Sequence, residues 1–218
     1  MKNKTFSPQT HIFLWDLHDV ILEKNMRHWI SLCLRFNRKW ELIRKLNTKS
    51  IKIFLTFALE RMKIIKKQMV SEELIAAARE NNNDALIELA TTICSAYAPI
   101  PGTINIMNEL TERGYKHHLG SNIGKTVFDN CLIQYPHIFT VFESYAIPFN
   151  KTETDIIKKP HPEFFLAHIH KHNLPANQFI FIDDKLTNVI AAQSVGMHAI
   201  QFKNAIQLRK ELIKKSII

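Results

Sequence analysis

The chain has 218 residues, 46% of them hydrophobic, which suits one domain or a core domain with a modest insertion. No apolar run approaches the ~20 residues of a membrane-spanning helix, and charged residues interrupt the N-terminal apolar stretch too early for a signal peptide. Three cysteines (Cys33, Cys94 and Cys131) lack Cys-x-x-Cys spacing. This argues against disulfides and against a cysteine-built zinc site, so we expect a reducing, cytoplasmic location.

The net charge of +9 is concentrated in one segment. Residues 24–67 contain 13 Lys or Arg and two acids (Glu41 and Glu60), a surplus of +11, so the rest of the chain is near neutral. Such a segment either attracts anions or forms a solvated helix face. Its aromatic residues fall on the apolar helix stripe and not between the charges, where they would stack on bases, so we do not expect a nucleic-acid partner.

The first strong pattern in the chain is a run of β-favouring residues from Ile12 to Trp15. It ends in Asp16 and then turns polar, with His18 and Asp19 close behind. In open α/β sheets, ligands bind just beyond the carboxyl ends of the strands. Asp16 is therefore a candidate functional residue.

Between residues 24 and 97 the pattern changes to that of helices. Apolar residues such as Met26, Trp29 and Cys33 recur at spacings of three and four, and no strand pattern interrupts them. We predict a four-helix domain over residues 23–98, inserted into a core domain made of residues 1–22 and 99–218.

After Pro101 and Gly102, strand and helix patterns alternate to the end of the chain. This alternation predicts a doubly wound, Rossmann-like α/β core with a parallel sheet and helices on both faces. Three further stretches carry polar residues at their ends: a strand that ends at Ser121 and Asn122, the sequence Lys158-Lys159-Pro160 before a helix over 162–172, and a strand that ends at Asp183 and Asp184.

These four stretches, in this order, resemble the signatures of the haloacid dehalogenase superfamily over about residues 11–202. The chain looks like its phosphatase branch, with a helical cap inserted after the first motif. The resemblance implies that Asp16 attacks phosphorus and forms an aspartyl-phosphate, that Lys159 offsets the charge, and that Ser121 and Asn122 bind the phosphoryl group. It also implies a small phosphate-bearing substrate and a Mg²⁺ ion held by Asp16, the His18 backbone carbonyl, Asp183 and Asp184.

The departure from the family pattern is His18, which stands where its phosphatases usually place a second, acid–base aspartate. Histidine can do this work, whereas Asp19 is one residue out of register. Two alternatives stay open. The first is a dehalogenase or a phosphonate-cleaving enzyme, the latter needing a lysine such as Lys24, Lys49 or Lys52. The second is a catalytically impaired protein that binds or regulates.

Other histidines also form patterns. His117 and His118 are neighbours in a predicted strand and should point to opposite faces. His168 and His172 share one face of a predicted helix. We interpret that face as solvated and favour this over an exposed two-histidine metal site. The sequence leaves the oligomeric state open.

Overall fold

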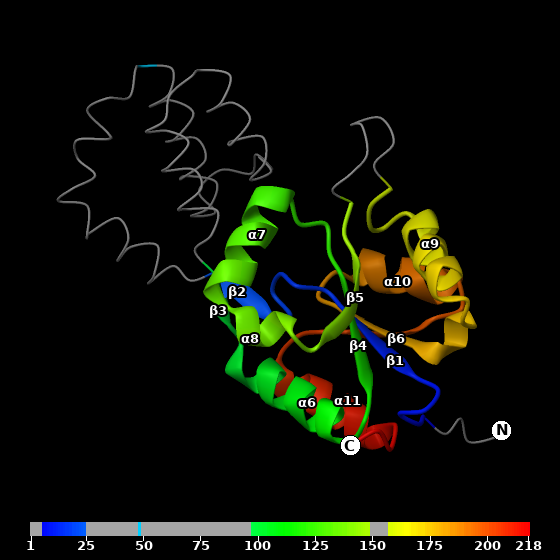
Figure 1. The fold of residues 1–218 in the computed structure, drawn as a ribbon. Helices are drawn as coiled ribbons and strands as arrows, with labels where there is room; N and C mark the ends of the chain where they lie inside the picture. The colour runs from blue at the N-terminus through cyan, green and yellow to red at the C-terminus, as the bar shows by residue number, and fades with distance from the viewer. Residues whose placement is uncertain (1–5, 25–47, 49–96, 149–156) are drawn as a thin grey trace. The chain divides into compact units, whose positions relative to one another are not determined.

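The computed structural model describes residues 6–24, 48, 97–148 and 157–218 (Figure 1). The predicted four-helix insertion, with Cys33 and Cys94, lies outside these residues, so the domain boundaries at 23–98 stay a prediction. The chain divides into two compact units, one of residues 1–23, 98–123 and 135–218, the other of residues 24–97 and 124–134. Among the helices that the structure describes, none is both long and apolar enough to cross a membrane.

The first unit is built on a five-stranded sheet in which all pairings are parallel. Its strands are β1 (Ile12–Trp15), β4 (Lys116–Gly120), β5 (Phe142–Ala146), β6 (Phe179–Asp183) and β7 (His198–Gln201), in the spatial order β5-β4-β1-β6-β7. The chain runs outward from β1 to β5 and then restarts on the other side with β6. The strand order therefore reverses around β1, and ligands of doubly wound sheets bind at such a point.

Helices cover both faces of this sheet, which confirms the predicted α/β class (Figure 1). On one face lie α6 (Pro101–Glu112) and α11 (Ala205–Lys214), which contact each other. On the other lie α9 (Pro162–His172) and α10 (Leu186–Ser194), also in contact. Helix α6 ends at Glu112, and Gly114 just beyond it adopts a left-handed conformation with φ 86°.

The central strands β1 and β6 are buried on both faces, as continuous apolar runs in a parallel sheet require. All residues of β1 and β6 are buried. On the α9 side, Phe165 packs edge-to-face on Phe181 with ring centroids 5.0 Å apart. Fully burying one such side chain contributes about 1.5–3 kcal/mol, so this aromatic layer fixes α9 firmly against the sheet.

The two neighbouring histidines of β4 do point to opposite faces. His117 accepts a hydrogen bond from Trp15 Nε1 at 2.9 Å and lies 3.1 Å from Thr111 Oγ1 of α6. His118 lies 2.9 Å from the ring of His168 on α9. Because His168 is only 2% exposed, the interpretation of its helix face as solvated is wrong. The strand contributes a third imidazole, which helical spacing alone does not reveal.

The remaining elements are short. Strands β2 (Leu22–Lys24) and β3 (Tyr97–Pro99) form a separate two-stranded sheet that the sequence pattern did not predict. Helix α7 spans Lys125–Gln134 and α8 spans Pro136–Phe139. A 3₁₀ turn at Ala176–Gln178 leads into β6.

Candidate functional site

The predicted site residues meet at the carboxyl edge of the sheet. Asp16 follows β1 and its backbone N–H donates to the carbonyl of Ile182 at 2.8 Å, so it sits level with the end of β6. Asp183 ends β6, and Ser121 follows β4 on the other side of β1. Three adjacent parallel strands thus bring these three residues to one place.

Lys159 is the centre of this group. Its side chain is 1% exposed, and its Nζ lies 2.8 Å from Asp16 Oδ1 and 2.6 Å from Asp183 Oδ2. The same ammonium donates to the carbonyl of Gly120 at 2.8 Å. All three donor positions of a lysine ammonium are therefore used, and one buried cation joins the ends of three strands.

Asn122 holds the backbone of Lys159 in place. Its Nδ2 donates to the Lys159 carbonyl at 2.8 Å, and its Oδ1 accepts from the Lys159 N–H at 3.0 Å. Both ends of the amide are therefore engaged by the segment that carries the lysine. The sequence suggested Asn122 only as a phosphoryl ligand, and that role stays a prediction. The geometry adds a positioning role.

The sequence reasoning missed Asn188, which is buried on α10. Its Nδ2 lies 2.9 Å from each carboxylate oxygen of Asp183, and the Lys185 N–H donates to Asp183 Oδ1 at 2.8 Å. Asp183 is thus fixed from both sides, by Lys159 and by α10. The sequence signal for this role was the position of Asn188, a polar residue five positions after the strand-end aspartate on the helix that follows.

The electrostatics of the group follow from its burial. Burial raises the pKa of the Asp183 carboxyl. The Lys159 ammonium lowers this pKa and the Asp16 carboxylate raises it, and the net pKa lies above the ordinary value. Burial, with Asp16 and Asp183 nearby, raises the pKa of the Asp184 carboxyl to about 6. Burial alone would lower the pKa of Lys159, but the two carboxylates outweigh it and raise that pKa. The site therefore has a surplus of negative charge, which a further cation would relieve.

The carboxylates form a suitable set of metal ligands. Asp16, Asp183 and Asp184 each offer an oxygen, and these oxygens all lie within 4.8 Å of one another. Hard carboxylate oxygens are the ligands that Mg²⁺ prefers, usually with several waters retained. The donor chemistry and the surplus of negative charge both fit the predicted magnesium ion.

Two predicted residues remain, Ser121 after β4 and His18 after β1. Ser121 is 1% exposed, and its Oγ has no hydrogen-bond partner among the residues that the structure describes. A buried hydroxyl without a partner costs about 1–3 kcal/mol, so a ligand oxygen in its reach would be favoured. His18 lies partly buried in the turn after β1, and the neighbouring Asp19 is exposed with a φ of 59°.

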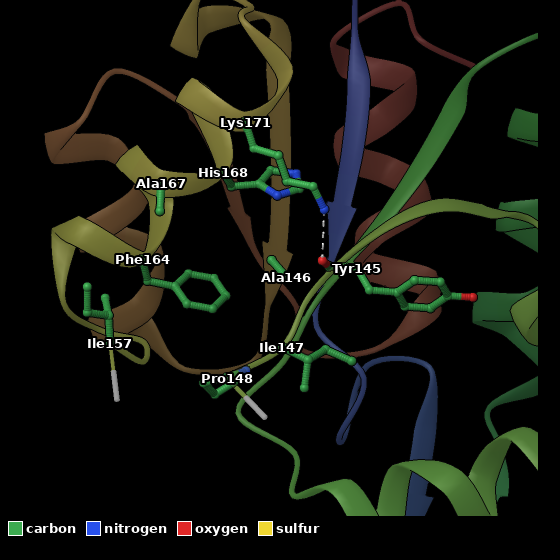
Figure 2. A pocket seen from close by; sticks show the side chains of 9 residues that line it. All are labelled: Tyr145, Ala146, Ile147, Pro148, Ile157, Phe164, Ala167, His168 and Lys171. Atoms are coloured by element: carbon green, nitrogen blue, oxygen red, sulfur yellow. Dashed lines mark hydrogen bonds between the residues drawn. The ribbon is translucent and has the colours of Figure 1, made fainter. Parts of the chain in front are cut away.

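A cavity of about 250 Å³ lies elsewhere, between the end of β5 and α9 (Figure 2). Its lining is mostly apolar, with Ile147, Pro148 and Phe164, and it has His168 and Lys171 on one side. None of the predicted site residues lines it. The three carboxylates lie at the strand ends, outside this cavity.

Comparison with known proteins agrees with the predicted family and fold. The family model of the haloacid dehalogenase-like hydrolases matches residues 10–196. A segment of 55 residues is 42% identical to the chloroplastic flavin mononucleotide hydrolase 1 of Arabidopsis thaliana, a match of 25% of this chain and 22% of that protein's length.

Solved structures share the fold, and two illustrate it. A HAD family enzyme of Bacteroides thetaiotaomicron, an Asp-to-Ala mutant in complex with magnesium and inorganic phosphate, aligns with a TM-score of 0.59 at 18% identity over 89% of this chain and 94% of that one. The L-2-haloacid dehalogenase of Xanthobacter autotrophicus aligns with a TM-score of 0.55 at 13% identity over 95% of this chain and 84% of that one.

Proposed function

Because the chain belongs to the haloacid dehalogenase-like hydrolases, we propose that it is a magnesium-dependent phosphatase of a small phosphorylated substrate. The observation that carries the proposal is the set of three strand-end carboxylates arranged around the buried Lys159. A dianionic phosphate needs cations to approach an aspartate, and this site combines a fixed ammonium with ligands for a divalent ion.

In this proposal Asp16 attacks phosphorus and forms an aspartyl-phosphate. A carboxylate is ionised at neutral pH and needs no base to activate it. Lys159 contacts Oδ1 of Asp16, so we assign the attack to Oδ2. The ammonium remains beside the reacting group and offsets the charge that the phosphoryl oxygens bring.

The Ser121 hydroxyl, which lacks a partner among the described residues, would donate to a phosphoryl oxygen. His18 would protonate the leaving oxygen as an imidazolium and, once neutral, take a proton from the water that hydrolyses the aspartyl-phosphate. Magnesium, held by Asp16, Asp183, Asp184 and the His18 carbonyl, would supply positive charge against the phosphoryl oxygens.

The substrate class follows from the same charges, since the site suits a phosphate monoester. Flavin mononucleotide is a specific candidate because of the 55-residue match to a plant protein of that activity. A dehalogenase would need neither the metal nor the cluster of carboxylates, and no described feature favours it.

The test is a panel of phosphate monoesters, including flavin mononucleotide, assayed with Mg²⁺ for released phosphate. We expect turnover by the wild type, none above background by Asp16→Asn, and wild-type rates for Asp129→Asn, a surface aspartate paired only with Lys125 among the described residues. A hydroxylamine-sensitive covalent phosphate should form on the wild type and not on Asp16→Asn. Equal activity of Asp16→Asn and wild type would refute the proposal.

A further inference from the structure

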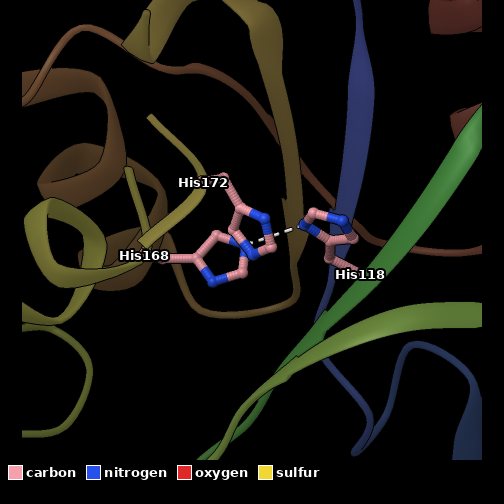
Figure 3. Close-up of side chains that lie close together, drawn as sticks. All are labelled: His118, His168 and His172. Carbon is pink, nitrogen blue, oxygen red and sulfur yellow. Dashed lines mark hydrogen bonds between the residues drawn. The ribbon is translucent and has the colours of Figure 1, made fainter. Parts of the chain in front are cut away.

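Three histidines come together on the opposite side of β4 from His117, away from the carboxylates. His118 points from β4 toward α9, where His168 and His172 stand one helical turn apart on the same face (Figure 3). One nitrogen from each imidazole lies within 4.8 Å of the other two. Histidines at i and i+4 on a helix can hold one metal ion together, and here a strand adds a third.

The protein itself does not satisfy this cluster. His118 Nδ1 and His168 Nε2 share one hydrogen bond at 2.9 Å, and His172 Nε2 lies 3.0 Å from Ser144 Oγ. His168 Nδ1 is buried and has no hydrogen-bond partner among the described residues. Buried polar groups are usually fully paired, so hydrogen bonds alone do not complete this cluster. The nitrogens that would take an ion are those that face one another, His168 Nε2 among them, and not His168 Nδ1.

The imidazoles are also in the state that binds metals, the neutral one. Burial lowers the pKa of His118 and of His168 to about 3 each, and burial lowers that of His172 as well. The Lys171 ammonium, which donates to Ser144 Oγ at 3.1 Å, is a cation close to this group. Because Lys171 is exposed, water screens its repulsion of a bound ion.

We propose that His118, His168 and His172 form a site for a borderline divalent cation such as Zn²⁺, separate from the carboxylates. Three neutral imidazoles select such ions over Mg²⁺, which prefers oxygen. His172 is the partly exposed member and gives the ion its path from solvent. The fourth position of a tetrahedral ion would be left to water or to Ser144 Oγ.

Binding requires a small adjustment. Bonds of ~2.0–2.1 Å in a tetrahedral arrangement place two nitrogen ligands about 3.3 Å apart. The 2.9 Å between His118 Nδ1 and His168 Nε2 must therefore lengthen slightly, and the metal replaces their hydrogen bond. The bound ion would tie α9 to β4 and raise the resistance of this region to unfolding.

The experiment is a titration of the full chain with Co²⁺, a spectroscopic substitute for Zn²⁺, in excess Mg²⁺, which occupies the carboxylates. We expect the visible absorption of four-coordinate, nitrogen-bound Co²⁺ at one equivalent, its displacement by Zn²⁺, and a thermal midpoint that rises with Zn²⁺ concentration. His172→Ala should weaken binding at least ~10-fold, since even the loss of a residue that supports a metal ligand costs 10–100-fold.

The matched control is His170→Ala, because His170 is on the same helix but exposed. It should bind like the wild type. A wild type that binds no Co²⁺ under these conditions, or equal affinities of wild type and His172→Ala, would overturn the proposal. His172 is partly exposed, so its variant folds more readily than one at the buried His168. Unchanged far-ultraviolet circular dichroism and Mg²⁺ affinity would show that it has folded.

Discussion

Replacing Lys159 by methionine should strongly destabilise the metal-free protein, because it removes the cation between two buried carboxylates. The lysine Nζ lies 2.8 Å from Asp16 Oδ1 and 2.6 Å from Asp183 Oδ2. At an effective dielectric constant of ~20, each pair attracts by about 6 kcal/mol before desolvation. Desolvation takes back several kcal/mol per ion, and the net cost of removing one partner from a buried pair is about 3–5 kcal/mol.

The assay is thermal unfolding followed by circular dichroism. In a chain of this size each kcal/mol moves the midpoint by ~2–4 °C, so Lys159→Met should unfold about 10 °C below the wild type. Lys158→Met is the matched control, because Lys158 is the adjacent residue and is exposed. Its midpoint should stay within ~2 °C of the wild type.

The pH dependence makes this prediction specific to charge. The pKa of Asp183 is raised by burial even with Lys159 beside it, and it rises further without the ammonium. A carboxyl whose folded pKa lies above its unfolded pKa stabilises the folded state below the unfolded value, and this stability is lost as the pH rises through the folded value. The difference in thermal midpoint between the wild type and Lys159→Met should thus be larger at about pH 8 than at about pH 5, and Mg²⁺ should reduce it. Equal midpoints for the two lysine variants, or a deficit independent of pH, would refute the reasoning.

Four further outcomes are expected. Asp183→Asn should weaken Mg²⁺ binding at least ~10-fold in calorimetry, and an unchanged affinity would remove Asp183 from the ligand set. Asn122→Ala should reduce turnover and lower the thermal midpoint, because it frees the Lys159 backbone, and wild-type kinetics would limit its role to packing. His18→Ala should lose ~10²-fold or more in turnover with little change in Mg²⁺ affinity, whereas a rise in turnover on His18→Asp would mark a decayed site. The pKa of His168 lies at about 3 when folded and near 6.5 when unfolded, so its stabilising contribution is complete above pH 6.5 and is lost as the pH falls toward 3. Urea unfolding at about pH 7 and about pH 5 measures this loss as a fall in the free energy of unfolding between the two pH values. The fall should be about 2 kcal/mol smaller in His168→Gln than in the wild type. Equal falls would contradict a buried neutral imidazole.

The sheet and its polar ends could be predicted from the sequence because local patterns determine them. The run Ile12–Trp15 is buried on both faces, and the polar residues from Asp16 onward mark its end in the sequence. The same holds for Phe179–Asp183, and parallel strands place such ends at one edge. The cytoplasmic location has no structural counterpart and stays a prediction.

The features that the sequence did not reveal depend on contacts between elements. The register of β4 places His118 against α9. The helical spacing of residues in α9 alone does not reveal this contact. The contact of Asn188 with Asp183 depends on how α10 leaves its strand. The pairing of β2 with β3 joins two segments more than seventy residues apart. Short strands with such partners carry too few residues for an alternating pattern.

In the proposed mechanism, the imidazole in the turn after β1 serves turnover and not binding. Its backbone is fixed, since the Leu17 carbonyl accepts from the N–H groups of Ile21 and Leu22, and the Asp19 N–H donates to the Leu22 carbonyl at 2.7 Å. Asp19 occupies a left-handed conformation that aspartate tolerates, and it is exposed. The adjacent carboxylate is therefore a poor substitute for an acid–base group, and in the proposed mechanism that role is left to His18. Ser121, Lys159, Asp183 and Asp184, which are assigned to phosphate or magnesium, lie outside this turn. Asp16 and the His18 backbone carbonyl belong to it, but neither depends on the imidazole. Loss of His18 should thus leave a protein that still binds both and turns over little.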